Sequence, residues 1–155
     1  LPPAFVRFSF LQTGCGKGLV LFLAAAAGFQ HLIGVDLSQE LLSIASANWK
    51  LLGFGEKATL ELLCQDAASV KLPDSPLVVY LFNPFGPGVM KRFMDNLEGS
   101  LKDNPRPVFA CYYLPVHHGV IDRSETLDLM RKEVDYRIYA SPEAMALSRG
   151  HAAHA

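Results

Sequence analysis

Short apolar runs recur along this chain, and each is rich in aromatic and β-branched residues. Runs of this length, bounded by glycine, proline or acidic residues, are typical of buried strands. The sequence therefore predicts six strands, over residues 5–12, 31–36, 58–66, 77–84, 107–114 and 134–140. Residues 144–149 are expected to pair back onto the last of these as an antiparallel strand.

The segments between these runs show helical spacing of apolar residues or the signals that begin and end a helix. Gly28 suits a C-terminal cap, Ser38 an N-terminal cap and Pro87 the first turn of a helix. Helices are expected over residues 17–28, 38–54 and 87–103, with weaker helical character over residues 120–132.

Strands that are apolar on both faces and alternate with helices indicate an α/β fold, a doubly wound and mostly parallel sheet covered by helices on both faces. The length of 155 residues fits one domain, expected over residues 1–149, with a flexible tail at 150–155. The chain opens with "LPPAFVRF", almost directly in a strand-like run. We therefore expect an N-terminally truncated fragment whose upstream helix is missing.

Composition and charge narrow the classes of partner. The net charge is −1, and we find no basic face of the kind that binding to nucleic acid or an anionic membrane requires. No apolar stretch has the length of a membrane span, and no basic segment precedes the first apolar run as in a signal peptide. The three cysteines form neither metal-type pairs nor a disulfide framework, so a reducing cytoplasm is expected and no metal site is predicted.

The stretch "LQTGCGKGLV", residues 11–20, places Gly14, Gly16 and Gly18 at alternate positions after the first predicted strand. Glycine lets a ligand approach the main chain closely, and a parallel sheet binds its ligands beyond the strand ends. The third glycine of a dinucleotide fingerprint would fall at Leu19, and the P-loop pattern does not fit. A tight turn without a ligand is the alternative.

Asp36 closes the second predicted strand, about twenty residues after the glycine loop. A carboxylate at that place can accept hydrogen bonds from both hydroxyls of a ribose. The loop and Asp36 together favour a nucleoside ligand, whereas either alone is also common as ordinary turn chemistry.

The segments "GCGKG", "GVDLS", "CQDA" and "NPFG" follow one another in an order and spacing that resembles the class I, Rossmann-like S-adenosylmethionine-dependent methyltransferases. The resemblance runs from about Phe5 to Leu114, and the NPFG motif is most similar to that of small bacterial methyltransferase-like proteins. It implies that S-adenosyl-L-methionine is the cofactor.

By the same resemblance, each segment has a part in holding the cofactor. Gly14, Gly16 and Gly18 pass under its methionine part, and Asp36 binds the ribose hydroxyls. Leu37 packs on the adenine, while Asp66, followed by Ala67, contacts the adenine amino group.

One position departs from the family pattern. The family usually has an acidic residue two positions before the first glycine, where this chain has Gln12. An amide accepts a hydrogen bond from the ammonium group of the cofactor but lacks the charge-assisted component. We therefore expect weaker cofactor binding or a loss of activity.

The motif "NPFG", Asn83 to Gly86, resembles the Asn-Pro-Pro-Tyr/Phe signature of amino-group methyltransferases, with Phe85 where the second proline would stand. The resemblance makes Asn83 and Phe85 the candidate substrate-side residues, with nitrogen as one acceptor atom. Methyl transfer from a sulfonium needs orientation and desolvation more than a strong base. Strand termination by Asn83-Pro84 is the alternative.

The leading hypothesis is a methyltransferase with an unidentified acceptor. A degenerate Rossmann-like module that binds a nucleoside weakly, or serves only interaction, is the second hypothesis, and Gln12 favours it. Nucleotide-dependent oxidoreduction is disfavoured by Leu19. His117 and His118 are candidates to line a substrate pocket, Cys15 is not expected to act as a nucleophile, and the sequence leaves the oligomeric state open.

Overall fold

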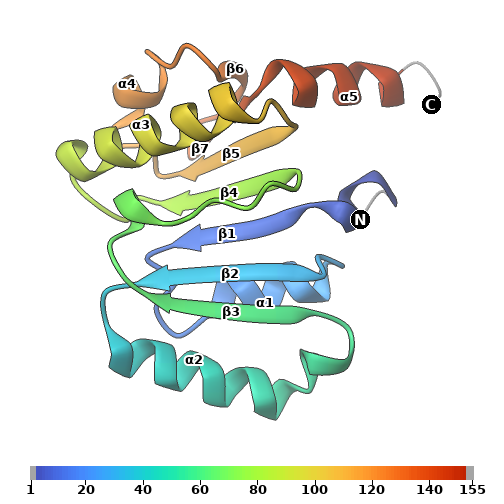
Figure 1. Ribbon diagram of the computed structural model, residues 1–155, viewed down its shortest axis with the longest axis vertical. Coiled ribbons are helices and arrows are strands. Elements are labelled where there is room, and N and C mark those ends of the chain that lie inside the picture. The colour runs from blue at the N-terminus through green and yellow to red at the C-terminus, as the bar shows by residue number, and fades with distance from the viewer. Residues whose placement is uncertain (1–2, 153–155) are drawn as a thin grey trace.

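The computed structural model describes residues 3–152, which form a seven-stranded sheet in the order β3-β2-β1-β4-β5-β7-β6 (Figure 1). Strands β1 to β5 pair in parallel, whereas β7 runs antiparallel to both β5 and β6. The strand bounds are β1 Ser9–Thr13, β2 His31–Asp36, β3 Thr59–Cys64, β4 Leu77–Phe82, β5 Val108–Tyr113, β6 Asp128–Lys132 and β7 Tyr136–Ala140. The predicted α/β fold with a mostly parallel sheet is confirmed.

Helices lie on both faces of the sheet (Figure 1). One face packs against residues of α1 (Leu19–Ala26), α2 (Gln39–Leu52) and α5 (Pro142–Ala152). The other packs against α3 (Pro87–Asp103) and α4 (His118–Ile121). Short 3-10 turns cover Pro3–Arg7, Phe54–Glu56 and Ala67–Ser69.

Several predicted caps lie where the sequence places them. The Ser38 hydroxyl accepts a hydrogen bond from the Leu41 N–H at 3.2 Å, so Ser38 caps α2. Gly28 follows α1 with φ 106° and donates its N–H to the Ala25 carbonyl at 3.0 Å. Pro87 begins α3, which has the bounds predicted for it, and β2 also matches its prediction.

Two predictions near the C-terminal end of the chain are wrong. Residues 120–132 were expected to be helical, but α4 is a single turn and residues 128–132 form β6, an edge strand with every residue exposed. Residues 144–149 were expected to form a strand but lie in α5. The Ser141 hydroxyl accepts a hydrogen bond from the Ala144 N–H at 3.3 Å and caps this helix.

The two chain ends also differ from expectation. Phe5 and the two residues after it lie in a 3-10 turn, and β1 begins only at Ser9. Helix α5 runs through Ala152 and therefore includes the first residues of the predicted tail, while residues 153–155 lie outside the described part.

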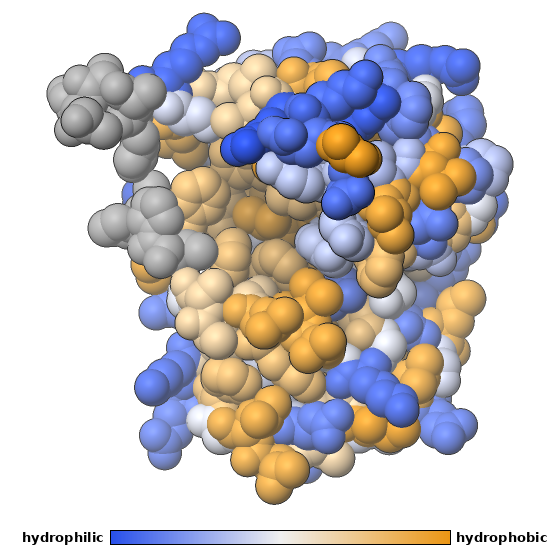
Figure 2. Space-filling view, turned by 180° about the vertical axis from the view of Figure 1, so that it is seen from behind, coloured by the Kyte–Doolittle hydropathy of each residue, from blue (hydrophilic) through white to orange (hydrophobic). Residues whose placement is uncertain are grey.

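Within residues 3–152, helices cover only part of the sheet face that lies behind β1, β4 and β5 in Figure 1. Figure 2 shows this face, hollowed and largely apolar. A groove of about 480 Å³ follows it, lined by Phe5, Phe10, Phe29, Val78, Phe109, Cys111, Met130, Ile138 and Ser148.

Within residues 3–152, no helix is both long enough and apolar enough to cross a bilayer.

Candidate functional site

The order of the strands brings the candidate residues to one edge of the sheet. The chain passes from β1 to β2 on one side and later returns to β4 on the other, so β1 lies between them. The carboxyl ends of these parallel strands open a crevice at such a switch point. Gly14, Asp66 and Asn83 follow β1, β3 and β4, and Asp36 is the last residue of β2.

The glycine loop joins β1 to α1 in a conformation that side chains oppose. Gly14 has φ +64°, and a Cβ there would lie 3.2 Å from the Pro84 Cβ. Gly18 has φ +89°, and a Cβ there would lie 2.6 Å from the ring of Phe22. Both glycines are therefore required by backbone conformation and by close packing.

The Asp36 carboxylate ties the glycine loop to the start of α2. Its Oδ2 accepts a hydrogen bond from the Gly16 N–H at 2.8 Å, and its Oδ1 accepts one from the Ser38 N–H at 2.9 Å. Each carboxylate oxygen has a second lone pair, so Asp36 can still accept hydrogen bonds from a ligand.

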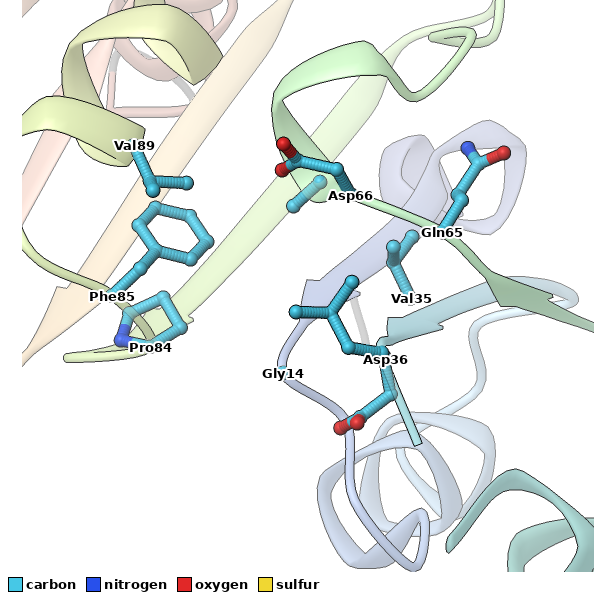
Figure 3. A pocket seen from close by; sticks show the side chains of 10 residues that line it. Gly14, Val35, Asp36, Gln65, Asp66, Pro84, Phe85 and Val89 are labelled. Atoms are coloured by element: carbon cyan, nitrogen blue, oxygen red, sulfur yellow. The ribbon is translucent and has the colours of Figure 1, made fainter. Parts of the chain in front are cut away.

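A cavity of about 310 Å³ lies between the three loops that follow β1, β2 and β3 and the corner that follows β4 (Figure 3). In Figure 3, Phe85 and Val89 lie on one side of the opening and Asp36 and Val35 on the other. Asp66 lies above and between these two groups in this view. Its lining comprises Gly14, Val35, Asp36, Leu37, Gln65, Asp66, Ala67, Pro84, Phe85 and Val89.

Five of the residues predicted to bind the cofactor line this cavity: Gly14, Asp36, Leu37, Asp66 and Ala67. The lining does not include Gln12, Gly16 or Gly18. Gly16 nevertheless acts on the cavity because its N–H fixes the Asp36 carboxylate. Sequence reasoning missed Val35, Gln65, Pro84 and Val89, although the first three directly adjoin predicted residues.

Asp66 is exposed but held at both carboxylate oxygens. The Ala68 N–H donates to its Oδ1 at 2.9 Å, and Arg92 Nη2 on α3 lies 3.3 Å from its Oδ2. The hydrogen bond from Ala68, followed by the contact with Arg92, keeps the pKa of Asp66 below its usual value despite slight desolvation. Asp66 is therefore an ionised hydrogen-bond acceptor at neutral pH.

Gln12 and Thr13 at the end of β1 are almost completely buried, with 5% and 1% of their surface exposed. Among the described residues, neither Gln12 Oε1 nor Thr13 Oγ1 has a hydrogen-bond partner. A buried polar atom without a partner is costly, and such atoms cluster where a protein binds a ligand or stores strain. The base of the glycine loop therefore holds unpartnered polar atoms that are buried beneath the cavity lining.

The two residues predicted for the substrate side lie in different surroundings. Phe85 lines the cavity with Asp66 and packs on Phe93 of α3, with 6.2 Å between ring centroids. Asn83 lies outside that lining, has φ +39°, and accepts a hydrogen bond from the Tyr112 hydroxyl at 3.4 Å. Asn83 therefore borders β5, while Phe85 forms a wall of the cavity.

Cys15, His117 and His118 also lie near this edge of the sheet. Burial, and then the Asp36 carboxylate, raise the pKa of the Cys15 thiol to about 12, which makes it a poor nucleophile. The His118 ring pairs with Asp122, and the backbone N–H of His117 donates to the Tyr112 hydroxyl at 3.2 Å. Residues 3–152 contain no cluster of three or more His, Cys, Asp or Glu side chains suited to a metal ion.

Comparison with known proteins identifies a family. Residues 10–104 match the family described as "Methyltransferase domain", which covers the glycine loop, the cavity and α3. A stretch of 50 residues is 42% identical to protein arginine N-methyltransferase 1 of Saccharomyces cerevisiae. That stretch is 32% of this chain and only 14% of the length of the yeast protein.

Solved structures share the fold at low sequence identity. The yhhF protein of Escherichia coli superposes with a TM-score of 0.66 at 17% identity, over 90% of this chain and 80% of that one. The ribosomal protein L11 methylase of Lactobacillus delbrueckii subsp. bulgaricus gives 0.57 at 18% identity, over 86% and 69%. Magnesium protoporphyrin IX methyltransferase of Synechocystis PCC 6803, solved with bound SAM, gives 0.57 at 16%, over 87% and 69%.

Proposed function

The chain belongs to the methyltransferase domain family, and we propose that it transfers the methyl group of S-adenosyl-L-methionine to an acceptor. One observation carries the proposal. Two carboxylates, Asp36 at the end of β2 and Asp66 just after β3, line the same cavity as the bare backbone of Gly14. Its volume of about 310 Å³ is within the range of small-molecule sites.

The residues present fit the chemical groups of this cofactor. Asp36 is placed to accept hydrogen bonds from ribose hydroxyls, and Asp66 to accept one from the adenine amine. Leu37, 77% exposed, and Phe85 supply apolar surface for the adenine ring. The unpartnered Gln12 Oε1 is available to accept from an ammonium group.

The chemistry that the cofactor supplies when bound is an electrophilic methyl group on a sulfonium sulfur. The protein contributes by holding the reactants in position and by excluding water. Asn83, with its backbone in the left-handed region and its side chain fixed by Tyr112, borders β5 beside the cavity. We assign Asn83 to acceptor positioning and Phe85 to the wall of the cofactor site.

Titration calorimetry with S-adenosylhomocysteine tests the proposal. We expect micromolar binding by the wild-type protein, and binding weakened about tenfold or more by Asp36→Asn, because a hydrogen bond to a charged group is removed. Asp95→Asn is the matched control. Asp95 is an exposed carboxylate on α3 that pairs with Lys91, outside the cavity lining, and its loss should leave the affinity unchanged.

Absence of binding to folded protein, checked by circular dichroism, would refute the proposal and favour the interaction module considered above. Tighter binding of NAD than of S-adenosylhomocysteine would instead assign the cavity to a nicotinamide cofactor.

A further inference from the structure

A second hollow opens at the carboxyl edge of the sheet, beyond β5. It has a volume of about 450 Å³ and lies between the segment that follows β5 and the β6–β7 hairpin. Its lining comprises Leu114, Pro115, Val116, His118, Lys132, Glu133, Val134 and Arg137. We call it the hairpin groove.

The hairpin groove adjoins the corner that follows β4. The buried Tyr112 hydroxyl donates to Asn83 Oδ1 at 3.4 Å and accepts from the His117 N–H at 3.2 Å. One tyrosine therefore holds both the end of β4 and the segment that forms a wall of the groove.

The wall of the groove is held in a strained conformation. Leu114 has φ +47°, which is unfavourable for a leucine. Its N–H donates to the Asp135 carbonyl of the hairpin at 2.7 Å, and the Val116 N–H donates back to the Leu114 carbonyl at 2.8 Å. Such strain persists only where the surroundings fix it, and it is concentrated at functional sites.

One carboxylate fixes two basic side chains of the groove. Asp122 accepts two hydrogen bonds from Arg137 Nη1, at 3.0 and 2.9 Å, and one from the Tyr139 hydroxyl at 2.7 Å. His118 Nδ1 lies 2.8 Å from its Oδ2. Desolvation alone would raise the pKa of Asp122, but hydrogen bonds from Tyr139, His118 and Arg137 outweigh it and lower that pKa.

The charges that line the groove leave an excess of positive charge. Glu133 is the acidic residue of the lining, and its Oε1 is already held by Arg131 Nε at 2.9 Å. Lys132 has no carboxylate partner within the part of the chain that the structure describes. A ligand with a negative group would therefore complement the groove.

Apolar side chains complete the walls. Leu114, Val116 and Val134 are 43%, 65% and 96% exposed, and all three line the groove. A ligand with an apolar body would cover this surface. The lining thus combines apolar walls with one unpaired ammonium group.

We propose that the hairpin groove binds the methyl acceptor, and that this acceptor is a small molecule with an apolar body and a carboxylate. Lys132 pairs with the carboxylate, while Arg137 stays bound to Asp122 and shapes the groove. Leu114, Val116 and Val134 pack on the apolar part. The assignment of this ligand as acceptor rests on the function proposed above.

Octanoate is the probe that tests this proposal, followed in two-dimensional amide NMR spectra of the nitrogen-15-labelled protein. We expect shifts at the amides of residues 114–118 and 132–137. Lys132→Met should weaken octanoate binding about fivefold, the effect of one partly exposed ion pair, while Lys132→Arg should retain it. Lys50→Met, an exposed lysine on α2, is the control and should bind as the wild type does.

Octan-1-ol and acetate separate the two parts of the recognition. We expect both to bind more weakly than octanoate, since the first lacks the charge and the second lacks the apolar body. Equal binding of octan-1-ol, or shifts confined to the apolar groove around Phe109, would overturn the proposal. Equal binding of acetate would reduce the groove to a simple anion site and would also overturn it.

The same samples keep this proposal separate from the cofactor proposal. S-adenosylhomocysteine is added to each, and its shifts are expected near Gly14, Asp36 and Asp66. Octanoate binding without S-adenosylhomocysteine binding would refute the methyltransferase role and leave an unassigned carboxylate site. S-adenosylhomocysteine binding without octanoate binding would refute only the acceptor proposal.

Discussion

At position 12, the side chain determines whether a bound ammonium group would meet a neutral amide or a charged carboxylate. Its amide is 5% exposed, and Oε1 has no partner among the described residues. A glutamate of the same length at this position would carry a charge into a buried place, which is unfavourable unless a cation pairs with it. The free protein and the ligand-bound protein should therefore respond to Gln12→Glu in opposite ways.

We predict that Gln12→Glu lowers the unfolding temperature of the free protein and tightens S-adenosylhomocysteine binding about tenfold, because charge-assisted hydrogen bonds are about twice as strong as neutral ones. Thermal unfolding and calorimetry measure the two effects. Gln65→Glu is the matched control, since Gln65 also lines the cavity but is only partly buried. An equal gain in affinity from Gln65→Glu would show that any added negative charge near the cavity tightens binding, and that position 12 has no special part in it.

Individual residues of the proposed cofactor site were predictable to different degrees. Gly14, Asp36 and Asp66 carry a signal in the sequence because each lies at or just after the end of a strand in a recognisable spacing. Phe85, assigned to the substrate side, lines the same cavity as Asp66. Its place depends on how the β4 corner turns against the glycine loop, where Pro84 approaches Gly14. No local pattern in the sequence encodes that contact.

At the scale of elements, Arg106 joins three segments beside the start of β5. It is 4% exposed and donates from Nε to the Ser75 carbonyl at 3.2 Å. Its Nη1 donates to the carbonyls of Ser100 and Asn104, and its Nη2 to the Ser100 hydroxyl at 2.9 Å. The guanidinium thus fastens the end of α3 and the loop before β4 to the turn that leads into β5.

Arg106→Met should therefore lower the free energy of unfolding by about 3 kcal/mol, because it removes the four hydrogen bonds that the buried guanidinium donates. Arg106→Lys should recover only part of this, since an ammonium cannot reproduce the planar set of donors. Urea unfolding measures both variants. Arg123→Met, at an exposed position before β6, should change stability by less than about 0.5 kcal/mol. A similar loss in both methionine variants would contradict the role given to Arg106.

The elements that were predicted correctly carry strong local signals. Strand β6 and helix α5, which were missed, carry weak or ambiguous ones. Strand β2 is an apolar run that ends at Asp36, and helix α3 begins at Pro87 and has apolar residues at helical spacing. Strand β6 lies at the sheet edge with both faces exposed, so its sequence shows no alternation. Helix α5 did carry a signal, since Ser141-Pro142-Glu143 is a typical helix start, but its alanines and Met145 also suited a hairpin partner.

At the scale of the whole molecule, the two faces of the sheet are covered unequally. Helix α3 and the buried side chains around it fill one face, whereas the other carries the apolar groove seen in Figure 2. Contiguous apolar surface of this kind is uncommon on a folded monomer. The sequence could not indicate it, because β4 and β5, which contribute to the groove, are apolar on both sides and their sequences are those of fully buried strands.

This groove should make the native protein bind 8-anilinonaphthalene-1-sulfonate, a dye whose fluorescence rises in apolar surroundings. Met130 lines the groove and is 41% exposed, so Met130→Glu should be tolerated and should weaken dye binding about fivefold through loss of apolar contact. Leu129→Glu is the matched control, because Leu129 is 45% exposed on the same strand but does not line the groove. Fluorescence titration at a temperature where the protein remains folded measures both. If Leu129→Glu weakens dye binding as much as Met130→Glu does, the dye binds elsewhere on β6. If the fluorescence does not rise with the wild-type protein, the groove is closed in solution.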